Sequence, residues 1–157
     1  MSYKIAIDSC GELLKEWKED ERIESVPLTL MVDGESIIDD ETFDQKDFLK
    51  KVAECPECPK SACPSPERYM KAYEDEAEHI YAVTLSSELS GSYNSAVLGK
   101  SLYLEEHPEK KIHVFNSRSA SGGESLIAMK IIECENKGFS FEEVVSTVEE
   151  YIEEMST

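Results

Sequence analysis

The sequence predicts an α/β fold, in which a mainly parallel sheet carries helices on both faces and so forms three layers. Three apolar runs, residues 4–7, 79–84 and 111–115, each end in polar, turn-forming residues. Helical patterns lie between and after these runs, and such alternation is typical of parallel sheets. Because the crossovers between parallel strands are right-handed, we expect the polar residues after the three strands to lie along one rim.

Composition indicates one globular domain. The chain has 157 residues, of which 40% are hydrophobic and 32% charged, which is enough for a single core. The net charge of -18 repels nucleic acid and anionic membranes, so we expect neither as a partner. A solvated surface and an acidic docking face both explain this charge. With no apolar run near the ~20 residues of a membrane span, no signal peptide and five cysteines, we expect a cytoplasmic protein with reduced thiols.

The chain after the first strand predicts a turn, a helix and extended segments. Asp8 and Ser9 open a polar turn that leads into a helix to about residue 17. Residues 23–26 and 27–32 are expected to be extended. Pro27 indicates either that they form an edge strand or that the strand is broken at this position.

A hairpin and a second helix are expected next. Asp33-Gly34 is a hairpin turn, and residues 35–38 would form the returning strand. Thr42 or Asp44 would cap the helix that follows. The apolar stripe of this helix would consist of Phe48, Leu49 and Val52.

Residues 55–66 contain four prolines, which predicts a loop without any regular element. Ser65 and Pro66 then form an N-cap and first-position pair, which opens a helix to about Glu76. Within the loop, Cys55 and Cys58 form a CxxC pair.

A structural zinc site would need more than this pair. It requires a second CxxC pair or suitably spaced histidines, and neither accompanies Cys63 or Cys134. We therefore expect no metal.

The second half continues the strand and helix alternation. A helix is expected from Ser92 to about Glu106, and another from about Glu124 to Asn136. Gly138 would end that helix, and the capping box of Ser140 and Glu143 would begin a last one over residues 141–155.

The most distinctive turn is residues 85–96, with the sequence LSSELSGSYNSA. Small hydroxyl residues and a glycine between a strand and a helix direct N–H groups and hydroxyls at one point, which suits an anion. Arg118 is the one basic residue in the rim loops, and so little positive charge favours a carboxylate over a polyphosphate. The alternative is that the serines only cap the next helix; they are Ser86, Ser87, Ser90 and Ser92.

Hydrolysis by a serine nucleophile would need a base near this turn. We expect His79, His107 and His113 to lie away from the rim, and the chain has no phosphate-loop or GxGxxG motif. A small-molecule hydrolase or transferase that uses the serine-rich rim stays open as an alternative. An acidic protein-interaction module is the other.

Five segments in order along the chain carry recognisable motifs: residues 7–13, 26–28, 60–66, 85–96 and 116–123. They resemble, in the same order, a DSTADL-type opening, VPL, a TSQPSP loop, SSxLSGTYxSA and DSxxxSxG. These are the motifs of the DegV family, bacterial fatty-acid-binding proteins that serve as binding subunits of fatty acid kinase.

The resemblance implies a DegV-like N-terminal lipid-binding domain over residues 1–157, without the family's second domain. It implies a non-catalytic carrier that binds a long-chain fatty acid and presents it to a partner kinase, with that fatty acid as the only ligand and no cofactor. The family's carboxylate-binding hydroxyls fall on Ser61, in place of the usual Thr, and Ser90. Ala62-Cys63 replaces the family's Ser-Gln. Supporting residues would be Asp8, Ser9, Gly91, Ser92 and Ser117.

Overall fold

A four-stranded sheet lies at the centre of the fold. In spatial order it consists of β2 (Ile23–Val26), β1 (Tyr3–Asp8), β6 (His79–Thr84) and β7 (Lys111–Asn116), and every neighbouring pair is parallel. The central strands β1 and β6 are buried along their whole length, as apolar strands covered on both faces must be. The computed structural model describes residues 3–8, 20–32, 35–38, 44–54, 60–87, 91–118 and 122–155.

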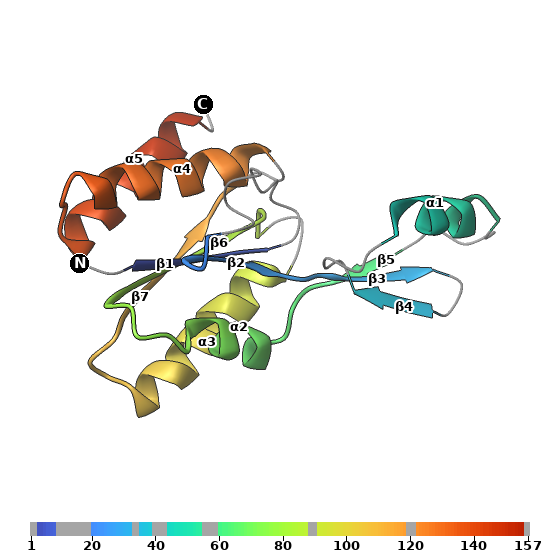
Figure 1. Ribbon diagram of the computed structural model, residues 1–157, viewed down its shortest axis with the longest axis horizontal. Helices are drawn as coiled ribbons and strands as arrows, with labels where there is room; N and C mark the ends of the chain where they lie inside the picture. Colours follow the sequence, from blue (N-terminus) through green and yellow to red (C-terminus); the bar gives the residue numbers. More distant parts are fainter. Residues whose placement is uncertain are drawn as a thin grey trace.

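Helices cover both faces of this sheet (Figure 1). α4 (Gly122–Asn136) and α5 (Phe141–Met155) pack on one face, and α2 (Pro66–Tyr73) and α3 (Ser92–Glu106) pack on the other. The three-layer, mainly parallel α/β fold that the sequence predicts is therefore confirmed.

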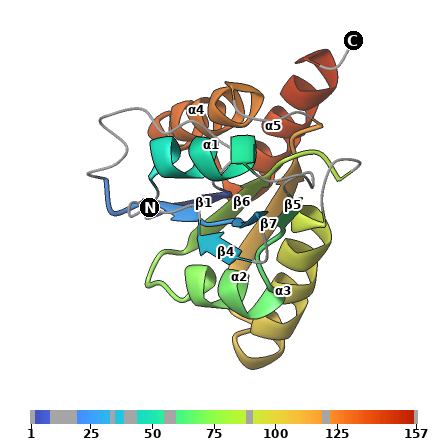
Figure 2. The same cartoon turned by 90° about the vertical axis from the view of Figure 1, so that its right-hand side faces the viewer.

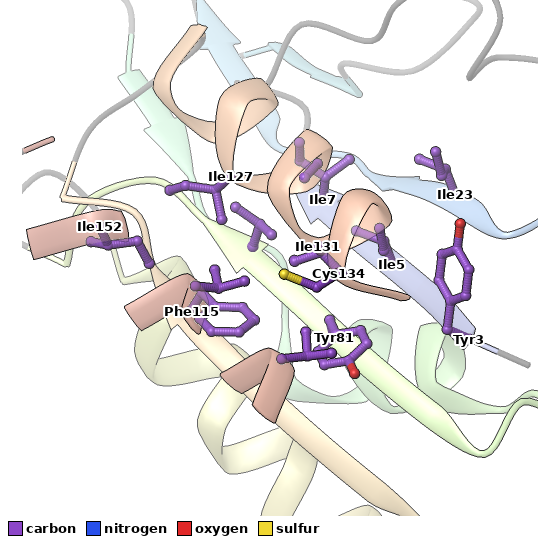
Figure 3. Packing of buried hydrophobic residues seen from close by; sticks show 14 residues of the cluster. Tyr3, Ile5, Ile7, Ile23, Tyr81, Phe115, Ile127, Ile131, Cys134 and Ile152 are labelled. Atoms are coloured by element: carbon purple, nitrogen blue, oxygen red, sulfur yellow. The ribbon is translucent and has the colours of Figure 1, made fainter. Parts of the chain in front are cut away.

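One hydrophobic core lies between the sheet and the pair α4 and α5. Ile127 and Ile131 of α4 are fully buried and pack with Ile5 and Ile7 of β1 (Figure 3). The ring of Phe115 on β7 completes the core where α5 covers it. Packing in this core holds α4 against the sheet. It therefore fixes where the start of α4 lies relative to the carboxyl ends of the strands.

A second core lies under α2 and α3. Tyr69 and Tyr73 of α2 are fully buried, and the Tyr73 hydroxyl donates to the Ala96 carbonyl of α3 at 2.9 Å. The two helices approach closely because Gly99 lacks a side chain: a Cβ there would lie 2.7 Å from the Pro66 carbonyl oxygen.

A second sheet forms a small lobe at the side of the main domain (Figures 1 and 2). It is antiparallel, in the order β4 (Glu35–Ile38), β3 (Thr29–Val32), β5 (Lys60–Ala62), and α1 (Gln45–Glu54) belongs to the same lobe. Pro27 separates β2, an edge strand of the parallel sheet, from β3 of the lobe. The prediction of an edge or a break at this proline is confirmed.

The strand β5 corrects the prediction that residues 55–66 hold no regular element. Pro59 and Pro64 lie outside the three residues of β5, which therefore keep the N–H groups that pair with β3. In this register Ser61 is opposite Leu30.

The helix boundaries are mostly as predicted. Asp44 caps α1 by accepting the N–H of Asp47 at 3.1 Å, and Ser65 caps α2 by accepting that of Arg68 at 3.2 Å. α2 ends at Tyr73 rather than near Glu76, because Glu74 already has an extended backbone.

Two further predictions have opposite outcomes. Leu49 is 57% exposed, so its place in a buried stripe was wrong; α1 has only the small three-stranded sheet to cover. The capping box of Ser140 and Glu143 is confirmed, because the Glu143 N–H donates to the Ser140 hydroxyl at 3.2 Å.

The predicted helix that ends near residue 17 and the Asp33-Gly34 turn lie outside the described residues. Within the described ranges, no helix is both long and apolar enough to cross a membrane.

Candidate functional site

The carboxyl ends of β1, β6 and β7 meet at one edge of the parallel sheet. The Leu85 N–H, just after β6, donates to the Asp8 carboxylate at the end of β1 at 2.7 Å. The Ser117 N–H, just after β7, donates to the Thr84 carbonyl at 3.2 Å. Asp8 is fully buried and Ser117 is 3% exposed. The predicted rim is confirmed for these residues.

The turn after β7 is joined to the serine-rich turn by Asn116. Its side-chain amide donates to the Ser87 hydroxyl at 2.8 Å, and its side-chain oxygen accepts the Ser87 N–H at 3.3 Å. The same oxygen accepts the N–H of Arg118 at 3.0 Å. Arg118 has a φ of 55°, and this turn holds it in the left-handed region.

Beneath the rim lies a group of buried polar side chains from four elements. The hydroxyl of Tyr69 on α2 lies near the Ser92 side chain of α3, and both residues are fully buried. Burial raises the pKa of Tyr69 well above its usual value, and the nearby Asp8 and Glu124 carboxyl groups raise it further. Both of these acidic residues are fully buried. The site therefore combines hydroxyl groups with two enclosed carboxyl groups.

Tyr69 and Glu124 were not among the predicted site residues. An acidic residue in the first turn of a helix that follows a rim loop is the signal that could have identified Glu124. Nothing in the helical pattern of α2 distinguishes Tyr69 from an ordinary core tyrosine. The pattern predicts which face of the helix is buried, but it does not predict what the tyrosine hydroxyl contacts.

The start of α3 decides between two explanations of the serines. The N-cap is Gly91, which makes no side-chain cap, and Ser92 lies inside the first turn with no exposed surface. Ser87 bonds to Asn116 of the neighbouring turn, and Ser86 is buried. Helix capping is therefore the wrong explanation for Ser87 and Ser92.

The segment after β5 contacts this same helix start. Cys63 Sγ lies 3.6 Å from the Ser95 hydroxyl of α3, and a Cβ built on Gly91 would lie 3.2 Å from it. The segments that follow Ser61 and Ser90 in the sequence are thus neighbours. Ser9 and Ser90 themselves lie outside the described residues, and for Ser61 the structure describes the backbone pairing with Leu30.

The three histidines lie away from the rim, as the sequence predicts. His79, at the start of β6, bonds through Nδ1 to Glu135 at 2.7 Å. His113 Nε2 lies 2.9 Å from Glu149, and His107 stacks on Tyr103 at the end of α3. Each is therefore engaged by its own neighbours outside the serine-rich rim.

A surface cavity of about 430 Å³ lies at the opposite edge of the sheet, where β6 and β7 begin. Its lining residues are Glu78, His79, Glu109, Lys110, Lys111, Ser140 and Phe141. Two lysines, two carboxyl side chains and one hydroxyl give this cavity mixed charge, and its lining contains no residue of the rim.

The described residues include two of the five cysteines. Cys63 is an exposed free thiol and Cys134 a buried one, whereas Cys55 and Cys58 lie outside the described residues. Among the residues that the structure describes, no group of three or more His, Cys, Asp or Glu side chains could hold a metal ion.

A parallel sheet between two helical layers, with hydroxyl and carboxyl groups gathered at its carboxyl edge, defines a three-layer α/β domain of the kind that binds ligands at strand ends. The chain belongs to the DegV family, whose model matches residues 2–157. This result confirms the resemblance drawn from its five motifs.

Solved structures agree with this assignment. A DegV-family protein from Ruminococcus gnavus, refined with vaccenic acid, is 58% identical with a TM-score of 0.95; the match covers 98% of this chain and 55% of that one. The Streptococcus pneumoniae fatty acid kinase (Fak) B3 protein, loaded with linoleic acid, is 41% identical with a TM-score of 0.90, over 98% of this chain and 55% of that one.

A curated relative gives the same result. A DegV domain-containing protein of Streptococcus pneumoniae is 44% identical over 129 residues, which is 82% of this chain and 46% of the relative. The chain thus spans about half the length of the relatives that it matches.

Proposed function

We propose that this chain binds a long-chain fatty acid through its carboxylate and presents it to a partner kinase, without catalysing a reaction itself. The observation that carries the proposal is the likeness, at 58% and 41% identity, to two DegV-family structures described with vaccenic and linoleic acid. Residues 1–157 would act as the N-terminal lipid-binding domain. In the longer relatives, the matched part is accompanied by a second half that would help to enclose the acyl chain.

In this proposal Ser61 and Ser90 hold the carboxylate with their hydroxyl groups. The start of α3 adds backbone N–H groups to the same place, and helix N-termini favour negative charge. The supporting residues are Asp8, Ser9, Gly91, Ser92 and Ser117. A buried acyl tail contributes about 0.8 kcal/mol per CH₂, so the tail dominates affinity and the hydroxyls set the orientation of the head group.

The positions of the histidines favour this carrier over a serine hydrolase. Each is engaged by its own neighbours away from the rim, so the described rim side chains offer hydroxyl, amide and carboxyl groups to a ligand. A hydrolase or transferase would instead depend on an acid such as Asp8, and Asp8→Asn would then abolish turnover. The carrier predicts no turnover to abolish.

The test is to extract the purified protein with organic solvent and identify the fatty acid by mass spectrometry. We expect a long-chain acid in the unmodified chain. Ser90→Ala and Ser61→Ala should each lower the amount retained about tenfold, since losing one hydrogen bond to a charged group costs about that factor. Ser146→Ala, on the exposed surface of α5, is the matched control.

Equal retention in Ser90→Ala and Ser146→Ala would overturn the site. No extractable lipid, together with an association that weakens in salt, would instead favour the acidic interaction module. Presentation is tested separately with a fatty acid kinase and ATP. Phosphorylation of vaccenic acid should require the protein, and a kinase that works equally well without it would refute presentation.

A further inference from the structure

Two segments that are distant in sequence meet at Gly91. The Cys63 thiol, just after β5, faces the start of α3, where a Cβ on Gly91 would lie only 3.2 Å from Sγ. Ordinary contacts between such heavy atoms are about 3.5–4.0 Å. The thiol also lies 3.6 Å from the Ser95 hydroxyl, one turn further along the helix. Glycine at position 91 therefore lets the two segments approach.

The same face of α3 receives α2 one turn later. Gly91, Ser95 and Gly99 are spaced four residues apart and so lie on one face of α3. A Cβ on Gly99 would lie 2.7 Å from the Pro66 carbonyl oxygen and 3.1 Å from Tyr69 Cβ. The N-cap residue Gly91 and two small residues of α3 thus receive a continuous stretch that runs from Cys63 into α2.

That stretch is held at both of its ends. Pro64 is buried, and Ser65 caps α2 through the N–H of Arg68 at 3.2 Å. On the other side, β5 is paired to β3 of the lobe. Cys63 lies between these two anchored parts, so its contact with α3 fixes how the lobe strand meets the helix.

We propose that Cys63 and Gly91 are positioning residues of the head-group site, because their contact sets the spacing between the strand that carries Ser61 and the turn that carries Ser90. This inference rests on the proposed function. Ser61 precedes Cys63 by two residues and Ser90 directly precedes Gly91, so the Cα atoms within each pair are at most about 7 Å and about 3.8 Å apart. A displacement at the contact is therefore passed to both hydroxyl-bearing residues.

Gly91→Ala tests this spacing directly. The added methyl group overlaps Sγ, and because Cys63 is exposed it would be displaced outward, away from α3. Removing Sγ in Cys63→Ala provides the missing room. Gly99→Ala is the matched control, since its methyl group meets a backbone carbonyl that no side-chain truncation at position 63 can move.

The experiment measures the Kd for vaccenic acid in the unmodified chain, the three single variants and the two double variants with Cys63→Ala. Gly91→Ala should raise the Kd about tenfold, and adding Cys63→Ala should return it to within about threefold of the unmodified value. Cys63→Ala alone, which loosens the contact, should raise the Kd by about two- to threefold. Gly99→Ala should gain nothing from Cys63→Ala.

Three outcomes would overturn the proposal: no effect of Gly91→Ala on Kd, no rescue by Cys63→Ala, or equal rescue of Gly99→Ala. If the unmodified chain does not bind vaccenic acid, the proposed function fails and the contact is judged by thermal unfolding of the same variants. A melting temperature lowered by Gly91→Ala and restored by Cys63→Ala would support the contact, whereas additive effects would refute it.

Discussion

The N–H of Leu85 donates to the carboxylate of Asp8 at 2.7 Å, and this bond joins the ends of β1 and β6 beneath the rim. Both residues are buried. Asp8→Ala leaves the N–H without its acceptor, so we expect the free energy of unfolding to fall by about 1–3 kcal/mol. Asp8→Asn keeps one acceptor oxygen and should lose less. Urea denaturation at constant m-value measures both changes.

A bond of the same type on the surface provides the control. The exposed Asp44 side chain accepts the N–H of Asp47, which is also exposed, at 3.1 Å. In Asp44→Ala, water can replace the lost acceptor, so the loss of stability should be smaller. Equal losses in Asp8→Ala and Asp44→Ala would contradict the role of the buried bond.

A second prediction concerns two buried tyrosine hydroxyls with different acceptors. Tyr81 donates to the Glu135 carboxylate at 2.6 Å, and Tyr73 donates to the Ala96 carbonyl at 2.9 Å. Hydrogen bonds to charged groups are the stronger class, worth about 1.5–3 kcal/mol against about 1 kcal/mol for neutral pairs. We therefore expect Tyr81→Phe to lower the free energy of unfolding more than Tyr73→Phe.

Chemical denaturation of the two variants decides this prediction. Each change removes one oxygen atom from a fully buried ring, so the lost packing is the same and the acceptor is the difference. Glu135 also holds His79, which keeps its carboxylate in place after Tyr81→Phe. A larger loss in Tyr73→Phe would mean that the Glu135 pair contributes little to stability.

The rim and the layers could be predicted from sequence because they follow from local patterns. An apolar strand followed by a polar turn and a helix specifies both burial and the edge at which the turn lies, so Asp8 and Ser117 were predicted at the right edge. The strand β5 was missed because its pairing depends on β3, about 30 residues earlier, and three residues carry no periodic signal. Glu124 and Tyr69 were missed for a related reason, since their environment is made by four separate elements.

Alkaline pH should unfold the protein together with ionisation of its buried tyrosines. Burial raises the pKa of Tyr69, Tyr73 and Tyr81 above the ordinary value of 10.0. Below pH 10 the folded and unfolded chains hold the same phenolic protons. Above it the unfolded chain loses them first, and stability falls by about 1.4 kcal/mol per pH unit for each such tyrosine.

Absorbance at 295 nm and far-UV circular dichroism, followed together from pH 9 to 13, measure this effect. Of the seven tyrosines in the chain, these three should ionise only with loss of helical signal. Tyr69→Phe should move the transition to higher pH if the variant folds as stably at pH 7. Complete tyrosine ionisation in protein that keeps its helical signal would contradict the prediction.

Two glycines should respond in opposite ways to the same pair of substitutions. Gly138 has a φ of 79° and nothing near the position of a Cβ, so its constraint is the backbone angle. Asn adopts the left-handed region more readily than Ala, and Gly138→Asn should be the more stable of the two variants there. Gly99 is helical and crowded by the Pro66 carbonyl, so its constraint is space. Gly99→Ala should cost about 1–3 kcal/mol and Gly99→Asn more, because overpacking grows with side-chain size. Thermal unfolding of the four variants would contradict this explanation if Ala and Asn ranked in the same order at both positions.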